Sequence, residues 1–297
     1  MIHAHYKHKK LVFPVRYDLK LTPNLEQFTF EGEVTVRVQT AVEKHLETKE
    51  VIMHAKELAF HSATFRPVNN CTIGNTASDV VEADEIRTNI KATTVAFVFP
   101  HALPLGSEVD ITIRYTGFLN NQMAGFYRSQ YKDIHGNTKY MASTQFESLD
   151  ARRAFPCWDE PSRKAVFSVA LVVDSHLTCM SNMPEKCVST IANNKKQITY
   201  LDSPKMSSYL LAFVVGEFDY VQEMTKHGVT IRLYTPPGKS NQGDYALKCA
   251  IDALDLFDDF FNVPYPLPKL DLVAIPEFAM VSDLVFTSEN TNYSNFM

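Results

Sequence analysis

One short segment of the chain, residues 144–161, concentrates the side chains that could do chemistry. Its sequence, TQFESLDARRAFPCWDEP, combines four carboxylates with two arginines, three aromatic rings and two prolines. One interpretation is a salt-bridged surface loop, because oppositely charged side chains often pair at protein surfaces. The other is a rigid loop that offers a carboxylate to a cationic ligand through charge-assisted hydrogen bonds. The residue types alone leave both interpretations open.

Cys157, within this segment, is the candidate nucleophile. A reactive thiol needs a neighbour that lowers its pKa, and in the nearby sequence only Arg152 and Arg153 could do so. A cysteine beside Trp158, the single tryptophan, is more typical of a core, where a free thiol packs as a small apolar residue. We therefore expect Cys157 to be structural.

Histidines at the amino terminus, His3, His5 and His8, could form a loose metal site. A histidine at position three beside a free amino terminus can also give copper(II) or nickel(II) a square-planar set of nitrogens. We favour the alternative, a terminal arm that binds no metal, because chain ends are usually poorly ordered. The ten histidines include no H-E-x-x-H pair, the helical spacing that presents two imidazoles to zinc.

Several other chemistries lack their motifs. The chain has no glycine-rich phosphate loop and no G-x-S-x-G turn for an activated serine. With a net charge of −5 and no basic stripe, we expect no nucleic-acid partner. We expect no membrane partner either, because no run approaches the roughly 18 apolar residues of a membrane span. Five irregularly spaced cysteines and the lack of an export signal favour a cytoplasmic protein with free thiols.

Apolar residues alternate with polar ones along the first two-thirds of the chain, which is the period of a strand with one buried face. The alternating runs are 17–21, 34–38, 95–99 and 109–115, with nearly continuous apolar runs at 166–173 and 209–215. Many strands joined by short polar turns predict a mainly β fold, either a β-sandwich or a large curved sheet.

After about residue 222 the order becomes strand, helix and strand, which predicts the start of a mixed α/β domain. Too few residues remain for a typical domain, and the last of them are polar and aperiodic. The predicted regions are a β-domain (1–222), an incomplete α/β domain (223–280) and a divergent tail (281–297).

The helix predicted in the second region extends from about residue 244 to 262. We expect Asp244 to be its N-cap and Pro264 to stop it. Its apolar face, at helical spacing, is predicted to comprise Ala250, Leu254, Phe257 and Phe261.

Residues 11–279 resemble the zinc aminopeptidases of the gluzincin class, most closely their puromycin-sensitive branch. Besides segment 144–161, the resemblance is carried by NLEQFTFEG (24–32), GFYRS (125–129), SNMP (181–184), YLLAFVVGE (209–217) and NVPYPLPK (262–269). In that family a curved all-β domain precedes a thermolysin-like catalytic domain. The resemblance therefore implies a large curved β-sandwich or saddle, followed here by the incomplete start of an α/β thermolysin-like domain.

The resemblance also implies site residues. The family captures the free α-ammonium of its substrate with carboxylates, and one of them belongs to a T-Q-[FC]-E stretch. This stretch maps onto Glu147, with Gln145 beside it. A carboxylate on a rigid loop can hold an ammonium and so fix its distance from the scissile bond. We expect Arg152 and Arg153 to pair with Asp159 and Glu160 rather than with Glu147.

The sequence departs from the family pattern after Ala279. The family continues into G-x-M-E-N, whose glutamate also binds the amine, whereas here Ala279 runs into Met280, Val281 and Ser282. The H-E-x-x-H helix and the more distant glutamate ligand have no counterpart. The resemblance thus implies zinc in the family, but no cofactor and no catalytic residue in this chain.

Together these observations predict the N-terminal part of a zinc-dependent aminopeptidase-like protein. The parent activity would be hydrolysis of N-terminal residues from peptides, and we expect the chain to be inactive alone. Its partners would be peptide N-termini, bound weakly, or a full-length aminopeptidase. The alternative function is a non-catalytic β module that binds peptides or proteins.

Overall fold

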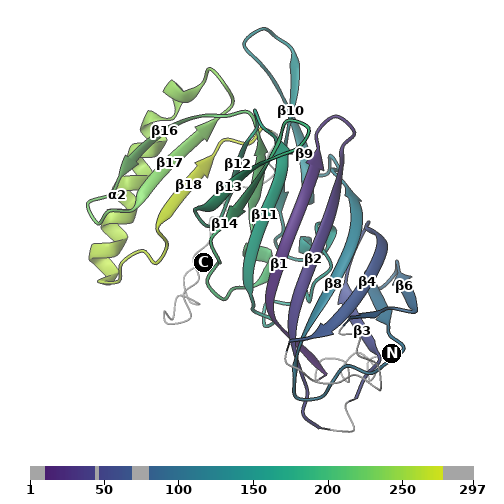
Figure 1. Cartoon of the computed structure of the whole chain (residues 1–297). Coiled ribbons are helices and arrows are strands. Elements are labelled where there is room, and N and C mark those ends of the chain that lie inside the picture. The colour runs from purple at the N-terminus through teal and green to yellow at the C-terminus, as the bar shows by residue number, and fades with distance from the viewer. Residues whose placement is uncertain (1–10, 44–46, 69–79, 277–297) are drawn as a thin grey trace.

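A long curved sheet forms the centre of the computed structural model, which describes residues 11–43, 47–68 and 80–276 (Figure 1). Its eight strands follow the order β13-β14-β11-β1-β2-β8-β4-β5. They are β1 (Val12–Asn24), β2 (Thr29–Thr40), β4 (Ala59–Pro67), β5 (Val81–Glu82), β8 (Glu108–Phe118), β11 (Val166–Asp174), β13 (Glu185–Ile191) and β14 (Lys195–Tyr200). The prediction of a mainly β fold with a large curved sheet is confirmed.

Strand β1 shows why the alternating pattern folds in this way. Tyr17, Leu19 and Leu21 point into the core, whereas Asp18 and Lys20 are exposed. Because side chains alternate across a strand, one face of β1 can be wholly apolar while the other meets water. β1 pairs antiparallel with β2 and parallel with β11, so it lies in the middle of the sheet.

Two smaller sheets lie against the long one. The first, in the order β3-β7-β6, comprises β3 (Glu50–His54), β6 (Glu85–Asn89) and β7 (Thr94–Val98). The second, in the order β12-β15-β10-β9, comprises β9 (Gly125–Lys132), β10 (Thr138–Gln145), β12 (Thr178–Ser181) and β15 (Phe213–Gly216). Aromatic rings pack between the sheets: the Phe126 ring on β9 lies 5.4 Å from that of Phe30 on β2, and the Phe97 ring on β7 lies 5.6 Å from that of Phe60 on β4. One hydrophobic core therefore joins the sheets.

A helix–sheet unit, residues 219–276, follows this core. Its sheet has the order β16-β17-β18, with β17 and β18 parallel, and helix α2 lies between them in sequence. The elements are β16 (Asp219–Met224), β17 (Thr230–Thr235), α2 (Asp244–Phe261) and β18 (Lys269–Val273). The unit has its own apolar cluster, which includes Ile231, Leu247 and Leu254. The predicted domain boundary after residue 222 falls within β16 and stays a prediction.

Helix α2 corrects two details of the prediction. Gly243, not Asp244, occupies the N-cap position; a β carbon there would lie 2.5 Å from the Leu233 side chain, so glycine fits the site. The helix ends at Phe261 with Asn262 in a left-handed conformation, close to the predicted end and shortly before Pro264. Phe257 is 53% exposed. The next buried residue after Leu254 is Asp258, four positions on, rather than Phe257, three positions on.

The expected tail, residues 281–297, and the sequence change after Ala279 lie outside the described residues. In the part of the chain that the structure does describe, no helix is both long enough and apolar enough to cross a membrane.

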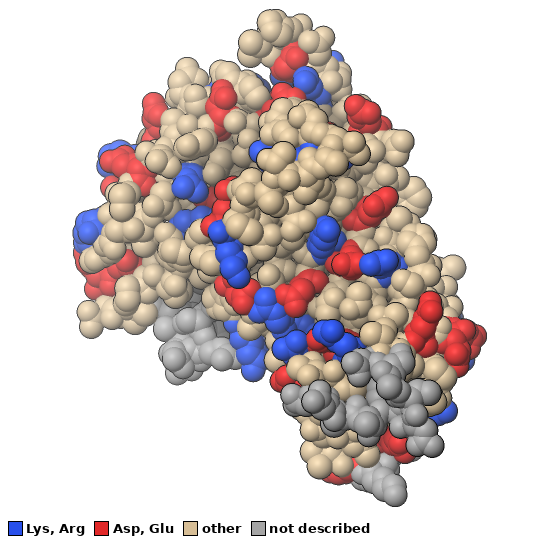
Figure 2. Space-filling model, in the orientation of Figure 1, with Lys and Arg blue, Asp and Glu red and all other residues tan. Residues whose placement is uncertain are grey.

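Acidic and basic side chains are interspersed on the face that Figure 2 shows. Charged side chains also pair across the strands of the long sheet. Arg37 Nε lies 2.8 Å from an Asp110 carboxylate oxygen, and Arg114 Nε lies 2.7 Å from one of Glu33.

Candidate functional site

The candidate site begins where β10 ends. Gln145 is the last residue of that strand and pairs with Gly125 of β9. Phe146 follows and is buried, with its ring 5.8 Å from that of Phe213 and 6.1 Å from that of Phe155 in edge-on packing. Glu147 comes next, partly exposed, and the peptide bond that follows it is cis. The residue before Glu147 is thus anchored in the core.

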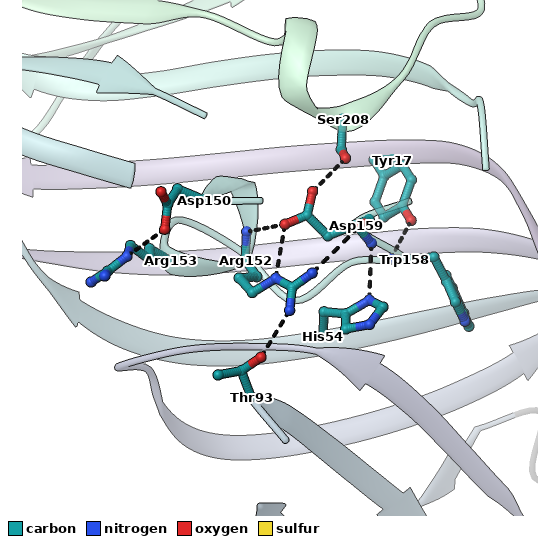
Figure 3. A network of polar contacts seen from close by, with 9 residues as sticks. All are labelled: Tyr17, His54, Thr93, Asp150, Arg152, Arg153, Trp158, Asp159 and Ser208. Atoms are coloured by element: carbon teal, nitrogen blue, oxygen red, sulfur yellow. Dashed lines mark hydrogen bonds and ion pairs between the residues drawn. The ribbon is translucent and has the colours of Figure 1, made fainter. Parts of the chain in front are cut away.

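A buried ion pair anchors the segment on its other side. Arg152, in the short 3₁₀ helix η2 (Ala151–Arg153), donates from Nε to Asp159 Oδ2 at 2.9 Å (Figure 3). The Arg152 side chain is 11% exposed and that of Asp159 only 1%. Ser208 Oγ donates to the other Asp159 oxygen at 2.8 Å, and Arg152 Nη1 donates to Thr93 Oγ1 at 2.8 Å. Both charges are satisfied, as burial requires.

Backbone contacts join the same segment to distant strands. His54 of β3 and Cys157 exchange backbone hydrogen bonds of 2.8 and 3.1 Å. The Asp159 amide donates to His54 Nδ1 at 3.2 Å, which assigns Nδ1 as an acceptor, and the Trp158 amide donates to the Tyr17 hydroxyl at 3.2 Å (Figure 3). Residues 152–159 are therefore fixed by both side-chain and main-chain contacts.

Arg153, the last residue of η2, forms a second set of ion pairs. Its Nε donates to Asp150 Oδ1 at 2.6 Å, and its Nη1 forms an ion pair with Glu57. Of the predicted pairing of Arg152 and Arg153 with Asp159 and Glu160, the structure shows Arg152 with Asp159, whereas the partners of Arg153 are Asp150 and Glu57. The prediction missed Glu57, because residues 96 positions apart carry no local sequence signal.

Within the described chain, neither arginine forms an ion pair with Glu147. Arg152 is held by Asp159, and Arg153 by Asp150 and Glu57. Among the described residues, neither arginine therefore holds Glu147 as a structural ion-pair partner.

Cys157 is fully buried, and burial raises the pKa of its thiol well above the ordinary value, with Asp159 adding to the effect. A thiol that stays protonated is a poor nucleophile. The structure thus agrees with a structural role for Cys157.

The amino-terminal histidines, His3, His5 and His8, lie outside the described residues. Among residues 11–43, 47–68 and 80–276, no group of three or more His, Cys, Asp or Glu side chains is placed to hold a metal ion. The described residues therefore do not fit a zinc centre, which needs at least three protein ligands.

Comparison with known proteins identifies the fold. The peptidase M1 N-terminal domain matches residues 13–210. Aminopeptidase M1-D of Oryza sativa subsp. japonica is 46% identical over 268 residues, which are 89% of this chain and 28% of the relative. The puromycin-sensitive aminopeptidase of Caenorhabditis elegans is 41% identical over 269 residues, 90% of this chain and 27% of the relative.

The alanine/arginine aminopeptidase of Saccharomyces cerevisiae is 42% identical over 271 residues, 90% of this chain and 30% of the relative. The chain thus spans less than a third of the length of these relatives. It belongs to the M1 aminopeptidase family, whose N-terminal β-domain it contains.

Proposed function

We propose that this chain supplies the amine-recognition part of an M1 aminopeptidase site. Glu147 accepts hydrogen bonds from the free α-ammonium of a peptide, and Gln145 lies beside it at the end of β10. The observation that carries the proposal is the fixed position of the loop. Phe146 is buried on one side, and the satisfied Arg152–Asp159 pair is buried on the other.

The chemistry of this step is simple. A carboxylate that accepts from an ammonium makes a charge-assisted hydrogen bond, worth roughly 1.5–3 kcal/mol. A fixed carboxylate also places the first peptide bond at a set distance from the reacting groups, which favours removal of single residues from the end. Because Glu147 is partly exposed here, this chain should bind an amine only weakly.

Peptide binding tests the assignment of Glu147. A fluorescent peptide with a free N-terminus and its N-acetylated form are titrated against the chain. We expect the free peptide to bind several-fold more tightly, and Glu147→Gln to remove the difference. The control Asp252→Asn, an exposed acid on α2, should leave it unchanged. Equal binding of both peptides by the wild-type chain would overturn the assignment.

For the complete protein, we propose the zinc-dependent removal of N-terminal residues from peptides. For this chain alone we propose no turnover, because its described residues do not fit a zinc centre. A fluorogenic aminoacyl amide assay, with and without added zinc, measures this directly. Activity that survives purification and disappears with a zinc chelator would contradict the proposal.

A second function, docking on a full-length aminopeptidase, is supported by the outer face of α2. Tyr245 and Phe260 are 81% and 76% exposed there, and exposed apolar groups of this kind often mark protein contacts. Co-sedimentation with a full-length M1 aminopeptidase, and its loss in Phe260→Glu, is the test.

We also propose the cytoplasm as its location. Cys157, Cys179, Cys187 and Cys249 are free thiols, as expected in a reducing compartment.

A further inference from the structure

A small pocket lies at the junction between the helix–sheet unit and the β-domain. Ser181 and Asn182, at the end of β12, line one side, and Lys269 and Asp271 of β18 line the other. Its volume is about 70 Å³, which is enough to admit water. The apolar clusters of the two parts are separate. The junction therefore lies between the two clusters and carries a charged pair, Lys269 and Asp271, in its lining.

Lys269 spans this junction. Its side chain is 8% exposed, and Nζ donates to the backbone carbonyl of Ser181 at 2.8 Å. The same ammonium forms an ion pair with Asp271, two residues along β18. Burial lowers the pKa of Lys269, and Asp271 opposes that change. The Lys269 ammonium is thus a buried donor that connects β18 to β12.

Asp271 balances the charge but is itself incompletely satisfied. Its side chain is 9% exposed, and Oδ1 has no hydrogen-bond partner among the described residues. The Tyr200 hydroxyl, on β14 of the long sheet, is also buried without a partner in the described chain. Burial is the main cause of the raised pKa of Tyr200, and Asp271 adds a small electrostatic effect, so the two groups lie within electrostatic reach. The junction therefore buries polar groups that would gain hydrogen bonds in water.

We infer that Lys269 is a charged latch that holds the helix–sheet unit on the β-domain, and that the chain opens there, together with this small unit, before the apolar cluster of the β-domain unfolds. A buried ion pair gains little net free energy, because each charge gives up its hydration. Opening rehydrates Lys269 and Asp271 and exposes β17 and β18, while it leaves the apolar cluster of the β-domain intact. Local opening of this kind takes place at the least stable contacts of a fold.

Hydrogen exchange on the full chain tests the inference. In Lys269→Met, amides of β17 and β18 should exchange about tenfold faster or more, because the link to Ser181 is lost. Amides of β1, β2 and β8 should keep their wild-type rates. Unchanged exchange in β17 and β18, or equal acceleration in every strand, would overturn the latch.

Two further variants separate the latch from general effects of charge. Lys226→Met removes a lysine whose ion pair with Asp259 stays within the helix–sheet unit, so exchange at β17 and β18 should not change. The double variant Lys269→Met/Asp271→Leu leaves no unpaired charge, and it serves also if the single variant fails to fold. Its β18 amides should still exchange faster than wild type. Wild-type protection in the double variant would show that Lys269 only neutralises Asp271, and the latch would be rejected.

Discussion

The side chain of Arg153 packs directly on the backbone of Gly125. A β carbon at Gly125 would lie 2.5 Å from the β carbon of Arg153, and Gly125 has a φ of +72°. Glycine is therefore required both by the close approach and by the left-handed backbone. This contact joins the start of β9 to η2, and so sets where residues 144–161 lie.

Gly125→Ala should lower the free energy of unfolding by about 2–4 kcal/mol, because it adds backbone strain and displaces Arg153. Urea unfolding measures the loss. Gly136→Ala is the matched control: its φ is +82°, but nothing lies within 4 Å of the added carbon. Only about 1 kcal/mol should be lost there. Equal losses in the two variants would show that Arg153 does not constrain Gly125.

Asp159→Ala should lower the free energy of unfolding by about 3–5 kcal/mol, because it leaves Arg152 charged and buried without its ion-pair partner. Urea unfolding followed by tryptophan fluorescence reports this well, since Trp158 adjoins the site. The control is Lys248→Ala, which breaks the exposed pair with Asp252 on α2. That loss should stay below about 0.5 kcal/mol. A loss under 1 kcal/mol in Asp159→Ala would mean that the network does not hold the segment.

Iodoacetamide should alkylate exposed cysteines faster than buried ones. Cys187 and Cys249 are exposed and should react in the native protein, whereas Cys157 and Cys179 should react only on unfolding. Burial raises the pKa of Cys179 to about 12. Thiolate should therefore form at Cys179 only as the pH approaches that value, and raising the pH from 7 to 9 should not speed its reaction. Peptide mass spectrometry after timed quenching measures each site. Native labelling of Cys157 would contradict the structural role.

Limited proteolysis should leave a stable core that ends near residues 220–230. The helix–sheet unit has its own small apolar cluster, and α2 exposes apolar side chains such as Tyr245 and Phe260. Intact mass of the first stable fragment places the boundary. A fragment that keeps Leu254 and Phe257 would put the domain boundary further along the chain.

The sequence predicts the parts of this fold that depend on local periodicity. Tyr17, Leu19 and Leu21 reveal β1 because every second side chain enters the core. β13 gives no such signal, because all seven of its residues are exposed and its place depends on pairing with β14. Strand β3 has only five residues, too few to show the alternation of buried and exposed side chains.

The contacts of the candidate site could likewise be predicted only in part. That the arginines pair with acids such as Asp159 could be predicted, because these residues lie in one short segment. Thr93 and Ser208 complete that network from 59 and 49 residues away. Nothing in the local sequence of either residue marks it, since only the packing of the sheets brings them to the same place.

The parallel pairing of β1 with β11 has a consequence for synthesis on the ribosome. One edge of β1 has its partner at residues 166–171, so that edge stays open until about 150 further residues have been made. At 5–20 residues per second, the delay is roughly 8–30 s. During that time a long strand with an apolar face can pair with other chains. Nascent chains that stop before β11 should therefore aggregate or recruit chaperones, whereas chains extended past residue 174 should not.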